Sequence, residues 1–133
     1  MVGPDHRMPA PRTITARREI ADQAKRVMLR RLAEPGLTLD DVAREVCVSK
    51  RQLQRAFAAV GTEGFLHELS RLRVIVAARM LEADPTLTIT DVVGRVGMRH
   101  RSNFARLFRQ HLGENPQTWR ARQRAVTPGR LAA

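Results

Sequence analysis

Polar side chains that can hydrogen-bond to DNA bases occur at helical spacing in the segment "KRQLQRAFAAV", which begins at Lys50. Arg51, Gln54 and Arg55 lie three and four residues apart, so a helix places them on one side together with Ala58. Arginine can form two parallel hydrogen bonds to guanine in the major groove, and glutamine can form two to adenine. The apolar positions of the same segment fall on the opposite side: Leu53, Ala56, Phe57 and Val60. The pattern predicts a helix with one buried side and one side able to contact bases.

A second segment, "RHRSNFARLFRQHL", has the same design. Its polar side carries Arg99, Ser102, Asn103 and Arg106, with Arg101 beside them near the expected helix start. The apolar side consists of Phe104, Leu107, Phe108 and Leu112. An ordinary solvent-exposed helix face would have a similar composition, so one such helix alone would not indicate nucleic-acid binding.

The whole chain is strongly basic. It has 133 residues, of which 24 are lysine or arginine and 13 are aspartate or glutamate, so its formal net charge is +11. This balance favours a polyanionic partner, with nucleic acid ahead of an acidic membrane surface. No apolar run approaches the ~18–20 residues that would cross a bilayer, so no membrane association is expected. We expect a soluble, intracellular protein.

Catalytic and metal chemistry are not indicated by the sequence. Cys47 is the only cysteine, and the four histidines lack metal-ligand spacing. The chain has no glycine-rich phosphate loop and no arrangement of serine, histidine and aspartate that spacing would support. We therefore expect no enzyme activity, no metal and no cofactor. Cys47 is expected to be a buried turn residue in preference to an oxidant sensor.

The two polar segments belong to a longer repeat. "LTLDDVAREVCVSKRQLQRAF" runs from Leu37 to Phe57, and "LTITDVVGRVGMRHRSNFARLF" runs from Leu87 to Phe108. Leucine, threonine, aspartate and valine recur in the same order at the start of each copy. A solenoid would need at least three copies, so two copies indicate duplication of one structural device.

Each copy begins with a helix-capping pattern. Two pairs have the spacing of a capping box: Thr38 with Asp41, and Thr88 with Asp91. At this spacing the threonine side-chain oxygen accepts a hydrogen bond from a backbone amide at the helix start, and the aspartate carboxylate accepts one from the threonine amide. A short helix follows in each copy. Gly97 marks its end in the second copy, since glycine adopts a left-handed conformation at no steric cost.

The turn that follows the short helix differs between the copies. Cys47 occupies the place of Gly97, which predicts a turn in the first copy that is either slightly strained or differently shaped. Ser49 is a natural N-cap for the second helix of that copy, whereas Arg99 and His100 stand there in the other. A short helix, a tight turn and a second helix with a polar face form the helix-turn-helix pattern.

The rest of the chain is expected to be helical too. One helix over 16–33 precedes the first copy, and a long helix over 62–83 joins the two copies. Asn115 and Pro116 would start a last short helix, with Trp119 as its core anchor. The long helix is expected to bury one continuous stripe: Phe65, Leu69, Leu72, Val76 and Met80. We predict an all-α fold of about seven helices. Its parts are a disordered tail (1–15), a first helix-turn-helix subdomain (16–61), a linker helix (62–84), a second helix-turn-helix subdomain (85–124) and a flexible tail (125–133).

This arrangement resembles the DNA-binding domain of the AraC/XylS family of bacterial transcription regulators. The resemblance covers Arg17 to Gln123. Its most specific parts are the first copy, "FLHELSRLRVIVAARML", and "ITDVVGRVGMRHRSNFARLFRQHLGENPQTWR". It implies two helix-turn-helix subdomains joined by a rigid helix. The second helix of each subdomain would enter the major groove, at two segments about one turn, ~34 Å, apart. A monomer would then span an asymmetric site of roughly two turns.

The resemblance also implies site residues and partners. Base contacts fall on Arg51, Gln54 and Arg55 in the first subdomain and on Arg101, Ser102, Asn103 and Arg106 in the second. Lys50 and Arg109 are expected to contact DNA phosphates. The expected partners are double-stranded DNA and RNA polymerase. The DNA-binding unit is expected to be monomeric, to act as an activator and to be cytoplasmic and nucleoid-associated.

Alternative hypotheses remain open from the sequence. Many relatives carry a separate sensor domain, so the chain could be the DNA-binding fragment of a longer effector-sensing regulator. A nonspecific basic nucleic-acid binder would need only the charge, and its affinity would follow salt and ignore sequence. A helical interaction module would bind a protein and keep no DNA affinity at moderate salt.

Overall fold

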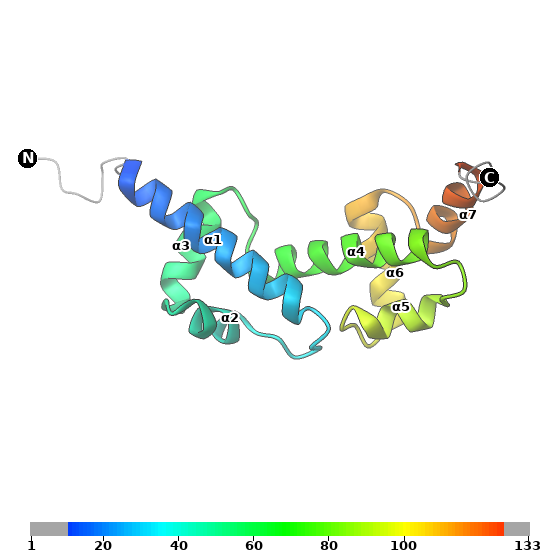
Figure 1. Cartoon of the computed structure of the whole chain (residues 1–133), viewed down its shortest axis with the longest axis horizontal. Helices are drawn as coiled ribbons and strands as arrows, with labels where there is room; N and C mark the ends of the chain where they lie inside the picture. The colour runs from blue at the N-terminus through cyan, green and yellow to red at the C-terminus, as the bar shows by residue number, and fades with distance from the viewer. Residues whose placement is uncertain (1–10, 127–133) are drawn as a thin grey trace, which may run out of the picture.

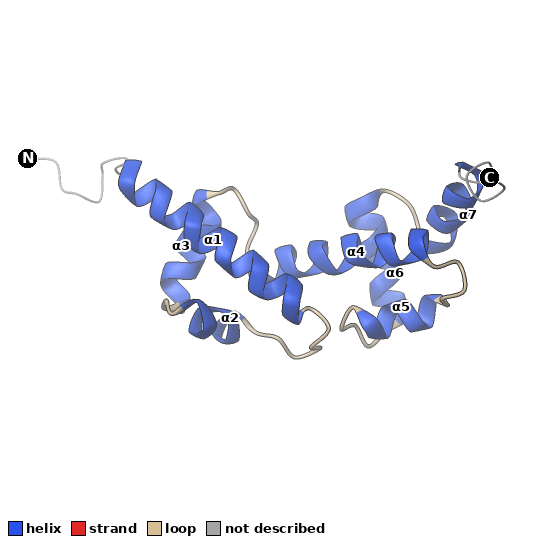
Figure 2. Cartoon of the chain, viewed as in Figure 1, coloured by secondary structure: helices blue, strands red, loops and turns tan. Residues whose placement is uncertain are grey.

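Helices form all the regular secondary structure in residues 11–126, the part of the chain that the computed structural model describes (Figures 1 and 2). They are α1 Pro11–Arg31, α2 Leu39–Val46, α3 Lys50–Ala59, α4 Phe65–Ala83, α5 Ile89–Arg95, α6 Arg101–Leu112 and α7 Pro116–Val126. This order confirms the predicted all-α fold of two helix-turn-helix units joined by a long helix. Within the described range, no helix is long and apolar enough to cross a membrane.

Both ends of the helical region extend further than the sequence predicts. α1 begins at Pro11, inside the segment 1–15 that is expected to be disordered, and α7 continues to Val126. Proline is tolerated at the first helical position because its missing amide hydrogen has no partner there in any case. The rest of both expected tails, 1–10 and 127–133, lies outside the described residues.

The predicted capping boxes are present at the start of both short helices. In the first, the amide of Asp41 donates to Thr38 Oγ1 at 3.1 Å, and the amide of Thr38 donates to Asp41 Oδ2 at 3.0 Å. Thr88 and Asp91 make the same pair of bonds at 3.0 Å each. The hydrogen bonds from the threonine backbone and hydroxyl lower the pKa of each aspartate. Local sequence alone thus places both helix starts.

The tight turns are left-handed in both copies, but their surroundings differ. Cys47 has φ 64° and ψ 40°, and Gly97 has φ 79°. Cys47 is exposed to solvent, so the expectation of a buried turn cysteine is wrong. Gly97, in contrast, is buried. The left-handed turn at Cys47 therefore holds a side chain in a conformation that costs a residue with a Cβ about 1–2 kcal/mol.

Replacing Cys47 by glycine should therefore stabilise the protein. We expect Cys47→Gly to raise the free energy of unfolding by ~0.5–1 kcal/mol, because the relief of strain exceeds the extra chain entropy of glycine. Urea unfolding followed by circular dichroism measures the change. Cys47→Ala is the matched control, since it removes the thiol and keeps the Cβ. Equal unfolding midpoints for the two variants would show that the turn is not strained.

The second helices of the two copies start differently, as their sequences predict. Ser49 caps α3, where its Oγ accepts from the amide of Gln52 at 3.0 Å and the Gln52 side chain accepts from the Ser49 amide at 2.8 Å. His100 occupies the N-cap position of α6 and makes no side-chain capping bond. The start of α6 is thus less firmly held by local hydrogen bonds than that of α3.

The linker helix α4 buries two different sides in succession. Its first half buries Phe65, Leu69 and Leu72, as predicted. Val76 and Met80 are only half-buried, so the prediction of one continuous stripe is wrong for the second half. The residues buried there are Val74, Ala77, Ala78 and Leu81. The change follows from the partners of α4, since it contacts α1 in the first unit and α5, α6 and α7 in the second.

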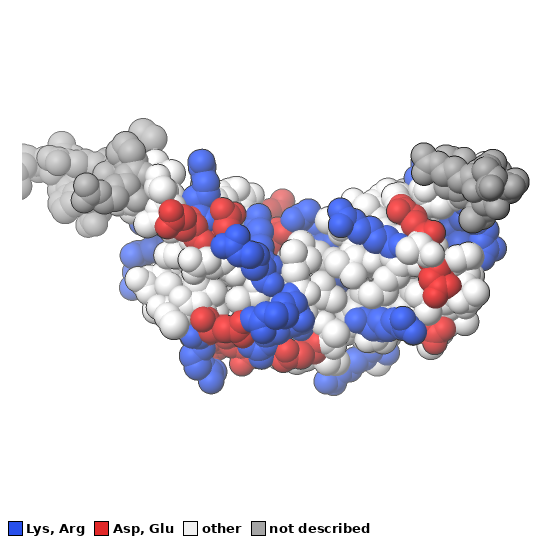
Figure 3. Space-filling view, in the orientation of Figure 1, with Lys and Arg blue, Asp and Glu red and all other residues white. Residues whose placement is uncertain are grey.

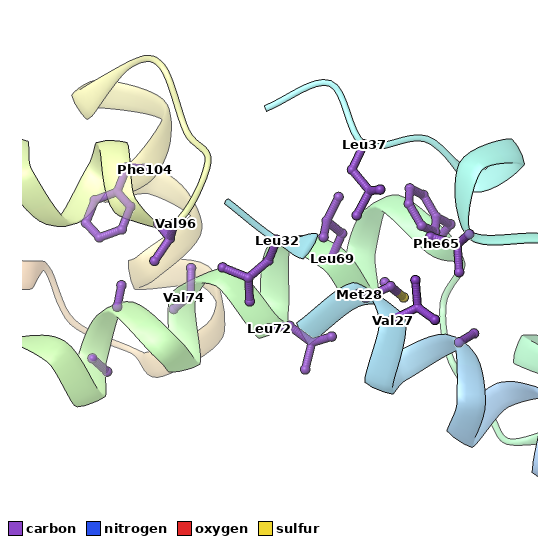
Figure 4. Packing of buried hydrophobic residues seen from close by; sticks show 14 of the residues in the cluster. Val27, Met28, Leu32, Leu37, Phe65, Leu69, Leu72, Val74, Val96 and Phe104 are labelled. Atoms are coloured by element: carbon purple, nitrogen blue, oxygen red, sulfur yellow. The ribbon is translucent and has the colours of Figure 1, made fainter. Parts of the chain in front are cut away.

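The buried apolar side chains form one continuous cluster through both units. Figure 4 shows Leu32, which directly follows α1, between Leu69 on the side of the first unit and Val74 on the side of the second. At the far end, Trp119 is partly buried and its ring meets Phe108 edge-on, with 5.9 Å between ring centroids. The predicted packing role of Trp119 is confirmed.

Candidate nucleic-acid interface

The outer side of α3 carries the residues that the sequence predicts. Arg51, Gln54 and Arg55 are all exposed, and Lys50 is exposed at the first helical position. The opposite side is buried through Leu53, Ala56 and Phe57, and it packs against α1. We call the exposed residues Arg51, Gln54 and Arg55 the first recognition face. Their orientation is set by burial of the other side of the helix.

The outer side of α6 is similar. Ser102, Asn103 and Arg106 are exposed, while Phe104 and Phe108 are fully buried on the other side. We call Ser102, Asn103 and Arg106 the second recognition face. Within it, Arg106 Nη2 donates to Asn103 Oδ1 at 2.6 Å. This bond leaves the Asn103 amino group and the remaining guanidinium donors available for a partner.

Arg101 and Arg109 lie at the margins of the second recognition face. Arg109 borders a shallow hollow of about 480 Å³ together with Ser102 and Arg106. Arg101 is exposed, but it precedes the buried Phe104 by three residues. It therefore lies on the same side of α6 as Phe104, which is opposite the second recognition face. The structure therefore groups Arg109 with the face and separates Arg101 from it.

Two residues near these faces were missed by the sequence reasoning. Gln110 borders the same hollow as Arg106, and its spacing of four residues from Arg106 could have identified it. Arg17 lines a hollow of about 240 Å³ together with Gln52 and Arg55, because α1 packs beside α3. No sequence signal links Arg17 to α3, since their proximity depends on tertiary packing.

Most basic side chains of the interface have no partner within the described residues. Elsewhere, Arg31 is paired with Glu34 at 2.7 Å and with Glu45 at 2.9 Å, and Arg71 is paired with Glu68. Among the residues that the structure describes, five basic side chains of α3 and α6 make no hydrogen bond or ion pair: Lys50, Arg51, Arg55, Arg101 and Arg109. Their charges are available to an external anion.

Acidic residues are absent from both recognition helices. Neither α3 nor α6 contains an aspartate or glutamate. In the view of Figure 1, α3 and α6 lie behind α1 and α4, toward opposite ends of the molecule. The near face in the same orientation carries acidic residues interspersed with basic ones (Figure 3). α3 and α6 therefore present positive charge with no acid on the same helix to neutralise it.

Comparison with known proteins shows the same domain. A family model described as a helix-turn-helix domain, of AraC type, matches residues 42–122, which is more than half of the chain. The chain belongs to the AraC-type helix-turn-helix family. This family consists of DNA-binding transcription regulators and is not an enzyme family, and the resemblance inferred from the sequence is confirmed.

Solved structures of AraC-type domains superpose on most of the chain. The AraC-type regulator from Chromobacterium violaceum is 28% identical, with a TM-score of 0.73 over 82% of this chain and 96% of that one. The DNA-binding domain of AdpA, solved in complex with a target DNA, is 29% identical, with a TM-score of 0.72 over 81% and 96%. The C-terminal domain of AraT, a response regulator from Geobacillus stearothermophilus, is 28% identical, with a TM-score of 0.69 over 77% and 84%.

For this AraC-type domain, the predicted phosphate contact at Lys50 has a measurable consequence. We expect Lys50→Ala to weaken binding about equally to every duplex sequence, and to reduce the slope of log affinity against log salt by about one. Fluorescence anisotropy titrations at several salt concentrations measure this slope. Lys25→Ala is the matched control, because Lys25 is the only other lysine and lies on α1. A similar change of slope for both variants would show that Lys50 contributes only to overall charge.

Proposed function

We propose that this protein regulates transcription by binding a specific DNA sequence, with α3 and α6 in two adjacent major-groove segments of one duplex. The observation that carries the proposal is the pair of recognition faces on α3 and α6. Each combines arginine with amide or hydroxyl groups, is exposed and has no acid on its helix. The AdpA domain, which is similar over 81% of this chain, was solved with a target DNA.

The residue types divide into two roles. Arg51, Gln54 and Arg55 would contact bases in one segment; in the other, the base contacts would come from Arg101, Ser102, Asn103 and Arg106. Lys50 and Arg109 would contact phosphates, where a single positive charge is enough. Arg101 would act from the start of α6, outside the main face.

Sequence-specific binding is favoured over nonspecific binding by the uncharged members of the faces. Gln54, Ser102 and Asn103 add nothing to electrostatic attraction, but they can distinguish bases by their hydrogen bonds. A protein that needed only charge would gain nothing from placing amide groups at the centre of an exposed helix face. Both faces contain such groups beside arginine.

The wider role we propose is activation of transcription by a DNA-bound monomer that also contacts RNA polymerase. Such a protein would act on the nucleoid in the cytoplasm. The functional parts would be a first DNA-contacting subdomain (16–61), a linker helix (62–84) and a second subdomain (85–124). A second candidate is that this unit works within a longer effector-sensing regulator. The similarity to the C-terminal domain of AraT, a response regulator, favours that version.

Selection of binding sites from random duplex DNA, with purified protein near physiological salt, tests the proposal. We expect an asymmetric motif with two short specified blocks whose centres lie about one helical turn apart, because each recognition helix would contact one block. One block alone would show that a single unit contacts bases. Tight binding at low salt with no enriched motif would refute the proposal in favour of a nonspecific binder.

In vitro transcription from a promoter that carries the selected motif tests the regulatory role. Stimulation by the protein, with template and RNA polymerase held constant, is the expected result. A decrease in transcript would show repression in place of activation.

A further inference from the structure

The turn after α1 meets the second helix-turn-helix unit at a place that we call the junction. It consists of Leu32 to Glu34, which directly follow α1 and which we call the α1 end, Arg73 of the linker helix, and the turn residue Gly97 of the second unit. α1 otherwise packs in the first unit, against α2 and α3. The junction therefore joins the first unit, the linker and the second unit directly.

Arg73 holds the end of α1 through two hydrogen bonds. Its Nε donates to the carbonyl oxygen of Leu32 at 3.0 Å, and its Nη2 donates to that of Glu34 at 2.7 Å. The Leu32 carbonyl directly follows the last residue of α1, where backbone acceptors have no partner within the helix. The Glu34 carbonyl also accepts from the amide of Leu37 at 3.2 Å, so Arg73 adds a second donor there. Burial lowers the pKa of Arg73, but a guanidinium remains charged in proteins. Its planar fork of donors suits two neighbouring carbonyls.

Gly97 brings the turn of the second unit against the same segment. A Cβ at this position would overlap the carbonyl oxygen of Leu32 and lie 2.9 Å from the carbonyl carbon of Ala33. The turn backbone thus packs directly on the end of α1. Cys47, at the equivalent position of the first unit, is also left-handed but is exposed. The difference between the two turns comes from the end of α1, which covers only the second.

The apolar core continues through the junction. The Leu32 side chain is buried, and Figure 4 places it beside Val74 of the linker helix, with Val96 of the second unit nearby. Val96 directly precedes Gly97. Three kinds of contact therefore meet at the junction: the hydrogen bonds of Arg73, the backbone packing of Gly97 and the burial of the Leu32 side chain.

We propose that the junction fixes the orientation of α6 relative to α3, and thereby sets the spacing between the two blocks of the DNA site. Arg73 is a positioning residue in this proposal, because it lies on the linker helix and bonds to the α1 end, outside both recognition faces. Each added base pair moves the second block by about 3.4 Å and turns it by about 35° around the duplex. Two units that moved freely on the linker helix would tolerate such changes, whereas units locked at the junction would not.

The first test needs no DNA. A spin label on the native Cys47 and a second on Gln117→Cys, which is exposed on α7, report the distance between the units by pulsed electron paramagnetic resonance. We expect a narrow distance distribution, and a clearly broader one when Arg73→Met is added. Arg79→Met is the matched control, since Arg79 is exposed on the same helix. A distribution that stays narrow in Arg73→Met would overturn the proposal, because the linker helix alone would then hold the units.

The second test uses DNA and rests on the proposed function. Duplexes carrying the selected two-block site are varied in block spacing by one base pair at a time. We expect the unlabelled parent protein to lose more than about tenfold in affinity per step, and Arg73→Met to lose less than about threefold. Affinity for a single block should be the same in both proteins, which excludes simple unfolding, and Arg73→Lys should fall between them.

The two proposals can fail separately. Equal spacing tolerance in the parent protein and in Arg73→Met would overturn the role of the junction in site spacing, even if the distance distribution broadened. Absence of any sequence preference in the parent protein would refute the proposed function. The distance measurement would still decide whether the junction holds the units together.

Discussion

Gly97→Ala is expected to lower the free energy of unfolding by ~4 kcal/mol or more, an effect at the upper end for a single substitution. Two costs combine at this position. The left-handed turn, with φ 79°, costs a residue with a Cβ about 1–2 kcal/mol. The added methyl group would also overlap backbone atoms of Leu32 and Ala33, and backbone cannot rotate away as a flexible side chain can. Urea unfolding followed by circular dichroism measures the loss.

Gly113→Ala is the matched control for this prediction. Gly113 is left-handed as well, with φ 84°, but a Cβ there would meet nothing within 4 Å. It should therefore show only the conformational cost of about 1–2 kcal/mol. If the two variants lose equal stability, the end of α1 moves away from the turn at little cost, and the close packing at the junction is not important for stability.

The double variant Arg51→Ala, Arg55→Ala is expected to lose ~2–6 kcal/mol of specific binding free energy, because each good base contact contributes about 1–3 kcal/mol. The site preference should relax in one block of the DNA motif and persist in the other. Stability should hardly change, since both side chains are exposed and make no hydrogen bond or ion pair among the described residues. Anisotropy titrations against the selected site and a scrambled duplex separate specific from nonspecific affinity.

A charge-matched control distinguishes base contact from loss of positive charge. Arg26→Ala with Arg79→Ala removes the same charge from exposed positions on α1 and α4. This double variant should weaken binding to both duplexes by similar factors and leave the motif unchanged. A selective loss of specific binding in the control, or no selective loss in the α3 variant, would refute the assignment of Arg51 and Arg55 to base contact.

Local sequence determined much of the architecture. Thr38 with Asp41, and Thr88 with Asp91, start their helices as predicted, because a capping box involves residues only three positions apart. The exposed and buried sides of α3 and α6 follow from the same short-range periodicity. The duplication of these patterns was sufficient to predict two helix-turn-helix units, and the matching family model agrees.

Only the tertiary structure decided the features that depend on distant partners. The buried side of α4 changes along its length because the helix serves two units in succession, a change that periodicity along one helix does not show. Arg17 comes beside Arg55 only because α1 packs on α3.

The turns at Cys47 and Gly97 show most clearly how local sequence and distant partners divide the outcome. Their equivalence in the repeat predicts equivalent turns, and both are left-handed. Yet one is exposed and the other lies against the end of α1, a segment more than sixty residues earlier in the chain. The sequence by itself determined the local conformation of the turns, the helix starts and the two polar faces, because these depend on neighbours within a few residues. The contacts that place one unit against the other depend on long-range packing, so only the folded chain decides them.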